Sequence, residues 1–206
     1  MPDNERLELV DQLAQLMIAR NAPVCYGTAE TAQQRTAAYR LRSQALIDRG
    51  FASPSDFQDG LEHDSFDERG IHILGWDETG EVIAAGRIVL PEAGLLLPTE
   101  AAFGLIVEPR GQVFDVGRFV VAHHFSNRAN LCFVGLLAFA WLVARRHGYH
   151  LACGTASASM LRYYRRIGFT FNALAPPRRY FGEERTPYRP DVVGSLETLM
   201  KAWGQE

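Results

Sequence analysis

The stretch Val113-Phe-Asp-Val-Gly-Arg-Phe-Val-Val-Ala122 has the pattern of a buried β-strand, yet it carries an arginine near its centre. A second stretch, Glu81-Val-Ile-Ala-Ala-Gly-Arg-Ile-Val-Leu90, has the same character. A guanidinium stays charged at physiological pH, so burying it without an opposite charge is costly. Arg118 and Arg87 therefore predict carboxylate partners that other parts of the chain bring to these strands.

The segments around residues 113–122 predict a mixed α/β (α+β) fold. Strands at 71–76 and 82–90 are joined by the hairpin turn Asp77-Glu-Thr-Gly80. The strand at 112–122 continues through a long helix to a strand at 150–156, which predicts a right-handed crossover and a parallel pair. We expect an N-terminal helix at 1–22 and a single domain at 23–206, with one central mixed sheet and helices on both faces. Further elements are expected as helices at 31–48, 98–103, 157–167 and 195–203, strands at 22–26 and 169–174, and loops at 51–68 and 176–190.

Composition excludes several classes of function. The 206 residues carry a net charge of −3, so no strongly basic surface indicates nucleic-acid binding. The apolar run at 131–144 is shorter than the roughly 20 residues of a membrane span, and it predicts a buried core helix. Cys25, Cys132 and Cys153 are odd in number and form no zinc pattern, which favours a reducing cytoplasm and no metal.

The segment Ser157-Ala-Ser-Met-Leu-Arg-Tyr-Tyr-Arg-Arg-Ile-Gly-Phe169 predicts a helix that stops at a glycine before a strand. Its ending, Tyr164-x-x-x-Gly168-Phe, resembles the last helix of the GNAT acyltransferase fold. The resemblance implies that Tyr164 protonates the departing thiolate, and a phenol with a pKa near 10 remains a proton donor at neutral pH. The alternative is that Tyr164 only fills space beside a helix cap.

The strand at 112–122 and the helix after it lie where GNAT proteins bind their acyl donor. A helix N-terminus there offers free backbone N–H groups to a phosphate or a pantetheine arm. The glycine-rich motif usual in acetyl-CoA users is absent, which is compatible with a donor that arrives on acyl carrier protein. The resemblance assigns donor binding to Val120, Val121, Ala122, Ser126, Arg128 and Asn130.

The order of charged residues resembles that of acyl-homoserine lactone synthases and the related N-acyl amino acid synthases. Those families have an arginine on the first helix, Asp-x-x-Asp in a loop, an arginine on a strand, and Glu-x-x-Arg on the next strand. Asp115 stands where the family has a glutamate, which keeps the carboxylate but shortens its reach. The matching residues, which would bind the acceptor or deprotonate it, are Arg42, Asp64, Asp67, Arg87, Asp115 and Arg118.

We therefore expect an N-acyltransferase that moves an acyl group from an acyl-carrier-protein or acyl-CoA thioester to the amine of an amino acid or similar small acceptor. Asp115, or a water it holds, would accept the amine proton, and backbone N–H groups of the strand at 112–122 would stabilise the oxyanion. No permanently bound cofactor is expected. Two alternatives stay open: an acyl-homoserine lactone synthase that uses S-adenosylmethionine, and a non-catalytic module that binds an acyl ligand or a carrier protein.

Overall fold

The computed structural model describes residues 3–204, and for Ser126 and Asn127 it describes the backbone only. The chain divides into two compact units. The first unit contains the chain up to Leu16, Leu90–Val116 and the residues from Trp141 onward, and the second contains Met17–Val89 and Gly117–Ala140. Strand β4 (Val113–Val121) and the helices α1 (Asp3–Ala19) and α4 (Ala129–Arg146) therefore contribute to both units.

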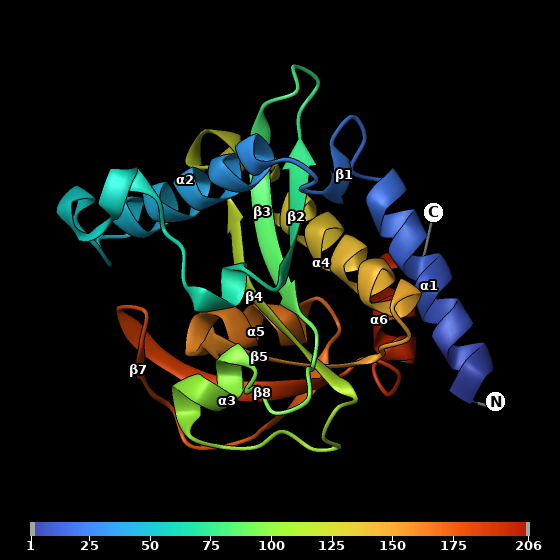
Figure 1. The fold of residues 1–206 in the computed structure, drawn as a ribbon. Helices are drawn as coiled ribbons and strands as arrows, with labels where there is room; N and C mark the ends of the chain where they lie inside the picture. The colour runs from blue at the N-terminus through green and yellow to red at the C-terminus, as the bar shows by residue number, and fades with distance from the viewer. Residues whose placement is uncertain (1–2, 205–206) are drawn as a thin grey trace. The chain divides into compact units, whose positions relative to one another are not determined.

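The second unit is built on antiparallel strands in the order β1 (Cys25–Thr28), β2 (Gly70–Trp76) and β3 (Val82–Val89), followed by the second half of β4 (Figure 1). The predicted hairpin between β2 and β3 is confirmed. Its turn is held by Asp77, whose Oδ1 accepts hydrogen bonds from the backbone N–H groups of Thr79 and Glu81, each over 2.9 Å. Such a short polar side chain stabilises a turn because it hydrogen-bonds to the backbone just after it.

Helices α2 (Ala32–Asp48) and α4 cover opposite faces of this sheet. Neighbouring residues of a strand point to opposite faces, so each strand supplies side chains to both helices. Helix α2 crosses β2 and β3 (Figure 1), and its Ala38 packs against Leu74 and Ala85. Val120 of β4 packs against the same cluster. The next residue back, Phe119, meets Phe133 of α4, with ring centroids 6.0 Å apart.

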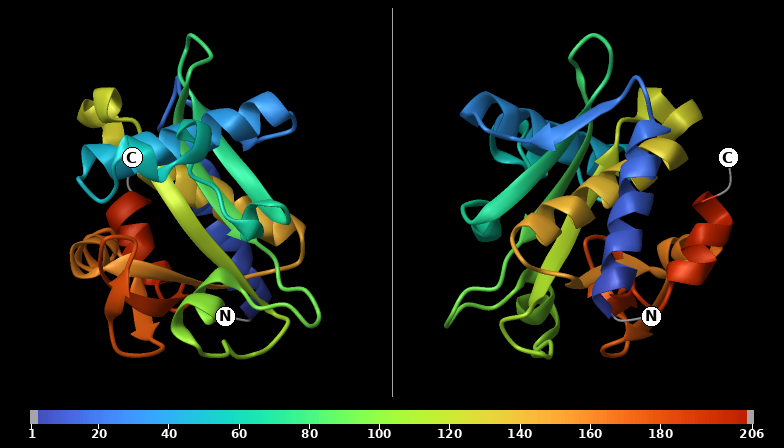
Figure 2. Two further views of the ribbon diagram at one scale, coloured as in Figure 1. Left: turned by 60° about the vertical axis from the view of Figure 1, so that its left-hand side comes forward. Right: turned by 90° about the vertical axis from the view of Figure 1, so that its right-hand side faces the viewer.

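The first unit contains the predicted parallel pair. The first half of β4 runs parallel to β5 (Leu151–Ser157), in a register that places Asp115 opposite Cys153. Strand β5 then pairs antiparallel with β8 (Glu183–Asp191), which also pairs antiparallel with β6 (Thr170–Ala173) and β7 (Arg178–Tyr180). Helix α5 (Ala158–Arg166) packs on β5 and β8 (Figure 2). Helices α3 (Pro98–Phe103) and α6 (Leu196–Trp203) complete the unit.

The prediction of a loop at 176–190 is wrong, because this segment forms β7 and β8. Pro187 and Pro190 lie inside β8, opposite Thr155 and Phe171 respectively. Proline lacks the N–H that a strand donates, which is why the segment resembles a loop in sequence. Its carbonyl still accepts, and Leu174 N donates to Pro187 O over 2.9 Å.

The remaining connections are short helical turns. The expected loop at 51–68 contains three 3₁₀ segments, Pro54–Asp56, Gln58–Gly60 and Ser65–Asp67, and a fourth spans His123–Arg128. Helix α4 is long and apolar enough to cross a membrane, yet 56% of it is buried within the protein, as expected of a core helix. The mixed α/β class predicted from the sequence is confirmed.

Candidate functional site

The second unit holds a buried cluster of three arginines and three carboxylates, which we call the charge cluster. Arg42 on α2 makes two parallel hydrogen bonds to Asp67, from Nη1 to Oδ1 over 2.8 Å and from Nη2 to Oδ2 over 3.0 Å. Its Nε donates to Glu62. This bidentate geometry matches the planar fork of a guanidinium to a carboxylate. Arg42 is only 2% exposed.

The two strand arginines complete the charge cluster. Arg87 Nη1 contacts Asp64 Oδ1 at 2.5 Å and Asp67 Oδ1 at 2.7 Å. Arg118 donates from Nε to Glu62 Oε1 over 3.0 Å and from Nη2 to Asp64 Oδ2 over 2.6 Å. The expectation that buried arginines on these strands meet carboxylates is therefore confirmed.

Glu62 is the member that sequence reasoning did not assign. The expected balance counted Asp115 as the third carboxylate, whereas in the structure Glu62 bridges Arg42 and Arg118. The only signal in the sequence was its place two residues before Asp64, in the same polar loop. Nothing in that loop distinguishes Glu62 from its acidic neighbours, because the choice depends on which side chain reaches the sheet.

The charge cluster controls the ionisation of Asp64 and Asp67. Burial alone acts to raise the pKa of Asp67, but hydrogen bonds and positive charge from Arg42 and Arg87 outweigh it and hold the pKa well below its usual range. The pKa of Asp64 is also lowered, because Arg87 and Arg118 outweigh its partial burial. Both groups are therefore carboxylates at neutral pH.

A histidine and a tyrosine form one wall of the charge cluster. His72 is buried on β2, where its Nε2 lies 3.2 Å from Asp67 O and 3.3 Å from the hydroxyl of Tyr39. Burial lowers the pKa of His72 despite the nearby Asp67. The ring is therefore neutral at pH 7 and adds no charge to a set that is already balanced.

The backbone at Arg118 lies in the left-handed region, with φ of 58°. This conformation is unfavourable for a residue with a Cβ, and it persists where surrounding structure holds it. The side chain of Arg118 is fixed at two carboxylates, Glu62 and Asp64. The charge cluster thus holds a strained residue two positions after Val116, the last residue of β4 that pairs with β5.

The charge cluster is most exposed at Asp64 and Arg118. Their side chains are 27% and 13% exposed, compared with 2% for the other two arginines and 4–7% for the other two carboxylates. This end presents one positive and one negative group. It has the charges needed to meet both ends of an amino acid.

The first unit holds the two candidate catalytic residues, Asp115 and Tyr164. Asp115 is 3% exposed, and its Oδ2 accepts a hydrogen bond from Thr99 N over 2.8 Å. The thiol of Cys153 lies 3.6 Å from the same oxygen. Asp115 therefore stabilises the N-terminus of α3, where a negative group is favourable.

Tyr164 is buried on α5, where Ser157 caps the helix N-terminus. The helix ends before Gly168, whose φ is +106°, and a Cβ there would lie 3.0 Å from the backbone of Thr198. The glycine predicted as a helix stop is required for both reasons. Burial raises the pKa of Tyr164, so the phenol remains protonated at neutral pH.

The expected donor-binding residues have varied surroundings. Ala122 N donates to Ile83 O over 2.8 Å, so this N–H belongs to the sheet and is not available to an oxyanion. Arg128 reaches the carbonyls of Asn21 and Ala22 at 3.4 and 2.9 Å. Val120 packs in the core beside α2, and Asn130 is exposed in the first turn of α4. The side chain of Ser126 lies outside the described residues.

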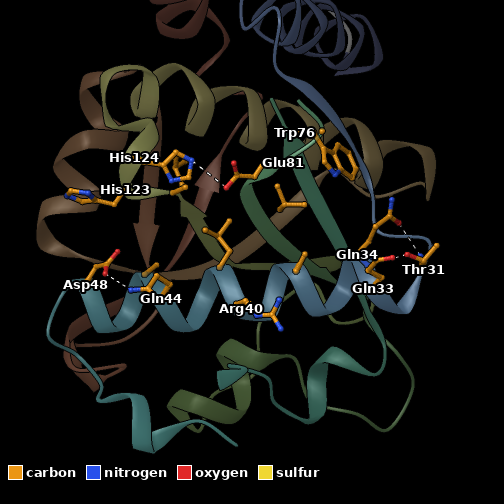
Figure 3. Close-up of a pocket in the computed structure, with 17 residues that line it drawn as sticks. Thr31, Gln33, Gln34, Arg40, Gln44, Asp48, Trp76, Glu81, His123 and His124 are labelled. Atoms are coloured by element: carbon orange, nitrogen blue, oxygen red, sulfur yellow. Dashed lines mark hydrogen bonds and ion pairs between the residues drawn. The ribbon is translucent and has the colours of Figure 1, made fainter. Parts of the chain in front are cut away.

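An open groove of about 830 Å³ lies between α2, the turn of the β2–β3 hairpin and the residues that follow β4 (Figure 3). Its apolar lining includes Leu41, Trp76 and Val121, while Arg40, Asp48 and Glu81 contribute charge. His123 and His124 also line it, but His124 Nε2 lies 3.7 Å from Glu81 with both side chains 60% exposed. Within the described residues, no group of three or more His, Cys, Asp or Glu side chains is placed to hold a metal ion.

Comparison with solved structures identifies the fold. The acyl-homoserine lactone synthase LasI matches with a TM-score of 0.65 and 17% identity, over 82% of this chain and 89% of its own. FeeM, an N-acyl amino acid synthase from uncultured soil microbes, matches with a TM-score of 0.66 and 16% identity, over 89% and 98%. A protein from Lactobacillus plantarum described as an N-acetyltransferase matches with a TM-score of 0.58 and 16% identity, over 81% and 96%.

No curated protein matches the chain in sequence. A family profile does match: that of the N-acyl amino acid synthase FeeM aligns with residues 37–186, well over half of the chain. This span includes the whole charge cluster, Asp115 and Tyr164. The chain therefore belongs to the FeeM family of N-acyl amino acid synthases and is an acyltransferase that acylates an amine.

Proposed function

We propose that the protein transfers an acyl group from an acyl-carrier-protein or acyl-CoA thioester to the α-amine of an amino acid. The observation that carries the acceptor assignment is the partly exposed end of the charge cluster, Arg118 with Asp64. Arg118 would bind the acceptor's carboxylate, and Asp64 would bind its ammonium group. An acceptor without a carboxylate would leave Arg118 to its protein partners alone.

In the reaction, the acceptor's ammonium group first loses a proton to solvent. The neutral amine then attacks the thioester carbonyl, a C–N bond forms and the C–S bond breaks. Tyr164 gives its proton to the departing thiolate, and Asp115 accepts the amine proton through a water molecule. The buried, protonated phenol of Tyr164 supports the first role. Asp115 is buried and already accepts a hydrogen bond from Thr99 N, so it would act on the amine only through such a water.

The test is transfer by purified protein from acyl-carrier-protein and acyl-CoA donors to pooled amino acids, followed by release of free thiol and by mass spectrometry of the products. We expect linear N-acyl amino acids. Omission of amino acids is the matched control, and it should lower thiol release to the background of hydrolysis. The absence of thiol release above that background with every donor would refute the proposal.

A second candidate is an acyl-homoserine lactone synthase, which the similarity in fold to LasI favours. Its acceptor would be S-adenosylmethionine, which also carries a carboxylate and an amine. The same assay, with S-adenosylmethionine in place of the amino acids, would give an acyl-homoserine lactone.

We also propose that the protein works in the cytoplasm. Cys25, Cys132 and Cys153 are all free thiols, as expected in a reducing compartment. Acyl carrier protein or CoA would then be the partner that delivers the donor. Fractionation of cells that express the chain would test this location.

A further inference from the structure

Tyr188 on β8 lies against Tyr164, and no motif in the sequence distinguishes it from the other tyrosines. The ring centroids are 5.6 Å apart at an interplanar angle of 41°. Tyr188 is opposite Gly154 of β5, and a Cβ at Gly154 would lie 2.7 Å from Val116 O. Both tyrosines are buried, at 5% and 7% exposure.

The hydroxyls of Tyr164 and Tyr188 are hydrogen-bonding partners. A phenolate can only accept, so Tyr188 donates once Tyr164 has lost its proton. Tyr164 also faces Tyr163 on its own helix and Arg185 of β8, while Asp115 and Cys153 influence Tyr188. Burial raises the pKa of both phenols, and the bond from Tyr188 partly offsets this increase at Tyr164. Of the two, Tyr164 is therefore the one prepared to lose its proton.

We propose that Tyr188 is a positioning residue for acyl transfer, whose hydroxyl stabilises the phenolate that forms when Tyr164 protonates the leaving thiolate. The inference rests on the proposed function. The proton passes from Tyr164 Oη to sulfur as the C–S bond breaks, and the bond from Tyr188 strengthens as charge grows on that oxygen. The proton released by the amine later restores the phenol through solvent.

The chemistry of the leaving group separates this role from mere packing. An alkyl thiolate, as in CoA or a carrier-protein arm, needs a proton to leave well, whereas an aryl thiolate has a lower pKa and leaves unaided. Tyr188→Phe keeps the ring and removes only the hydroxyl. A hydrogen bond to a charged group is worth about 1.5–3 kcal/mol, so we expect kcat to fall about tenfold or more with alkyl thioesters. With an aryl thioester the change should be less than about twofold on the same reasoning.

Tyr180→Phe, on the neighbouring strand β7, is the matched control and should leave both rates unchanged. Tyr164→Phe should show the same dependence on the donor, with a larger loss. An equal fall of kcat with both donors, or no fall with either, would overturn the role of Tyr188 while leaving the proposed function standing.

A second measurement does not require turnover. Absorbance titration at alkaline pH follows phenolate formation, and subtracting the Tyr164→Phe curve isolates Tyr164. Loss of a donated hydrogen bond disfavours the phenolate, so its pKa should be higher in Tyr188→Phe than in the unaltered protein. If no acyl transfer is found at all, the proposed function fails, and an unchanged titration would then reject the pairing as well.

Discussion

The two units each bury a polar group, and they do so by different physical means. In the charge cluster every arginine meets a carboxylate, because a buried charge without a partner is prohibitively costly. In the other unit, Tyr164 and Tyr188 are neutral, and a hydrogen bond between their hydroxyls together with ring packing accompanies their burial. The charge cluster therefore holds its carboxylates ionised, whereas the tyrosine pair is buried in its neutral, protonated form.

The largest effect should come from breaking the charge cluster at its most buried strand residue. Arg87→Met removes the positive charge that Asp64 and Asp67 share, so their buried negative charges are no longer fully neutralised. Removing one member of a buried ion pair typically costs about 3–5 kcal/mol, and urea denaturation would measure this loss. Arg40→Ala, on the exposed side of α2, is the control and should change the free energy of unfolding by less than about 0.5 kcal/mol. If Arg87→Met lowers the free energy of unfolding by less than about 1 kcal/mol, the buried charges of the cluster do not depend on this partner as proposed.

Acid should distinguish the two regions in a second way. The folded pKa values of Asp64 and Asp67 lie below the unfolded values, so these groups stabilise the fold above a pH of about 4. This stability should disappear as the pH falls through the lower, folded values. Urea midpoints measured between about pH 6 and 3 should decline in the unaltered protein. They should decline less in Arg87→Met, and identical slopes would show that the arginine does not set these pKa values.

Asp115 tests whether a buried carboxylate in the first unit serves structure, chemistry or both. Asp115→Ala leaves the N–H of Thr99 without its acceptor, which should cost about 1–3 kcal/mol of stability. Asp115→Asn keeps an oxygen acceptor and should cost little stability, yet kcat should fall about 100-fold if the base is lost. Full activity in a stable Asp115→Asn variant would show that Asp115 only stabilises the N-terminus of α3 and is not the base.

The smallest effect concerns the strained backbone at Arg118. Both Arg118→Gly and Arg118→Ala lose the ion pairs, but only glycine adopts a φ of 58° without strain. The glycine variant should therefore be more stable than the alanine variant by about 1 kcal/mol, opposite to the usual order within a strand. Thermal unfolding of the two purified variants would measure the difference. An alanine variant that is equally or more stable would indicate that Arg118 relaxes once its ion pairs are lost.

Much of the fold follows from local sequence pattern. Apolar periodicity and turn residues predicted the hairpin, the parallel crossover, and the helices that end at Asp48 and before Gly168. The family resemblance and the cost of buried charge also pointed to the arginines and to their aspartate partners. These features are visible because each depends on neighbours in the chain or on a charge that is expensive anywhere in a core.

Only the tertiary structure decided three other features. Pro187 and Pro190 lie inside β8, paired with β5 and β6, although neither has an N–H to donate, and the carbonyl of Pro187 still accepts from Leu174 N. Glu62, rather than another acidic residue, completes the charge cluster because it reaches two arginines from different elements. Tyr188 of β8 contacts Tyr164 of α5, and this contact could not be predicted from the sequence, because a neutral hydroxyl does not require a charged partner. The sequence thus determined where charge had to be compensated, and packing over long distances in the chain determined which side chains did so.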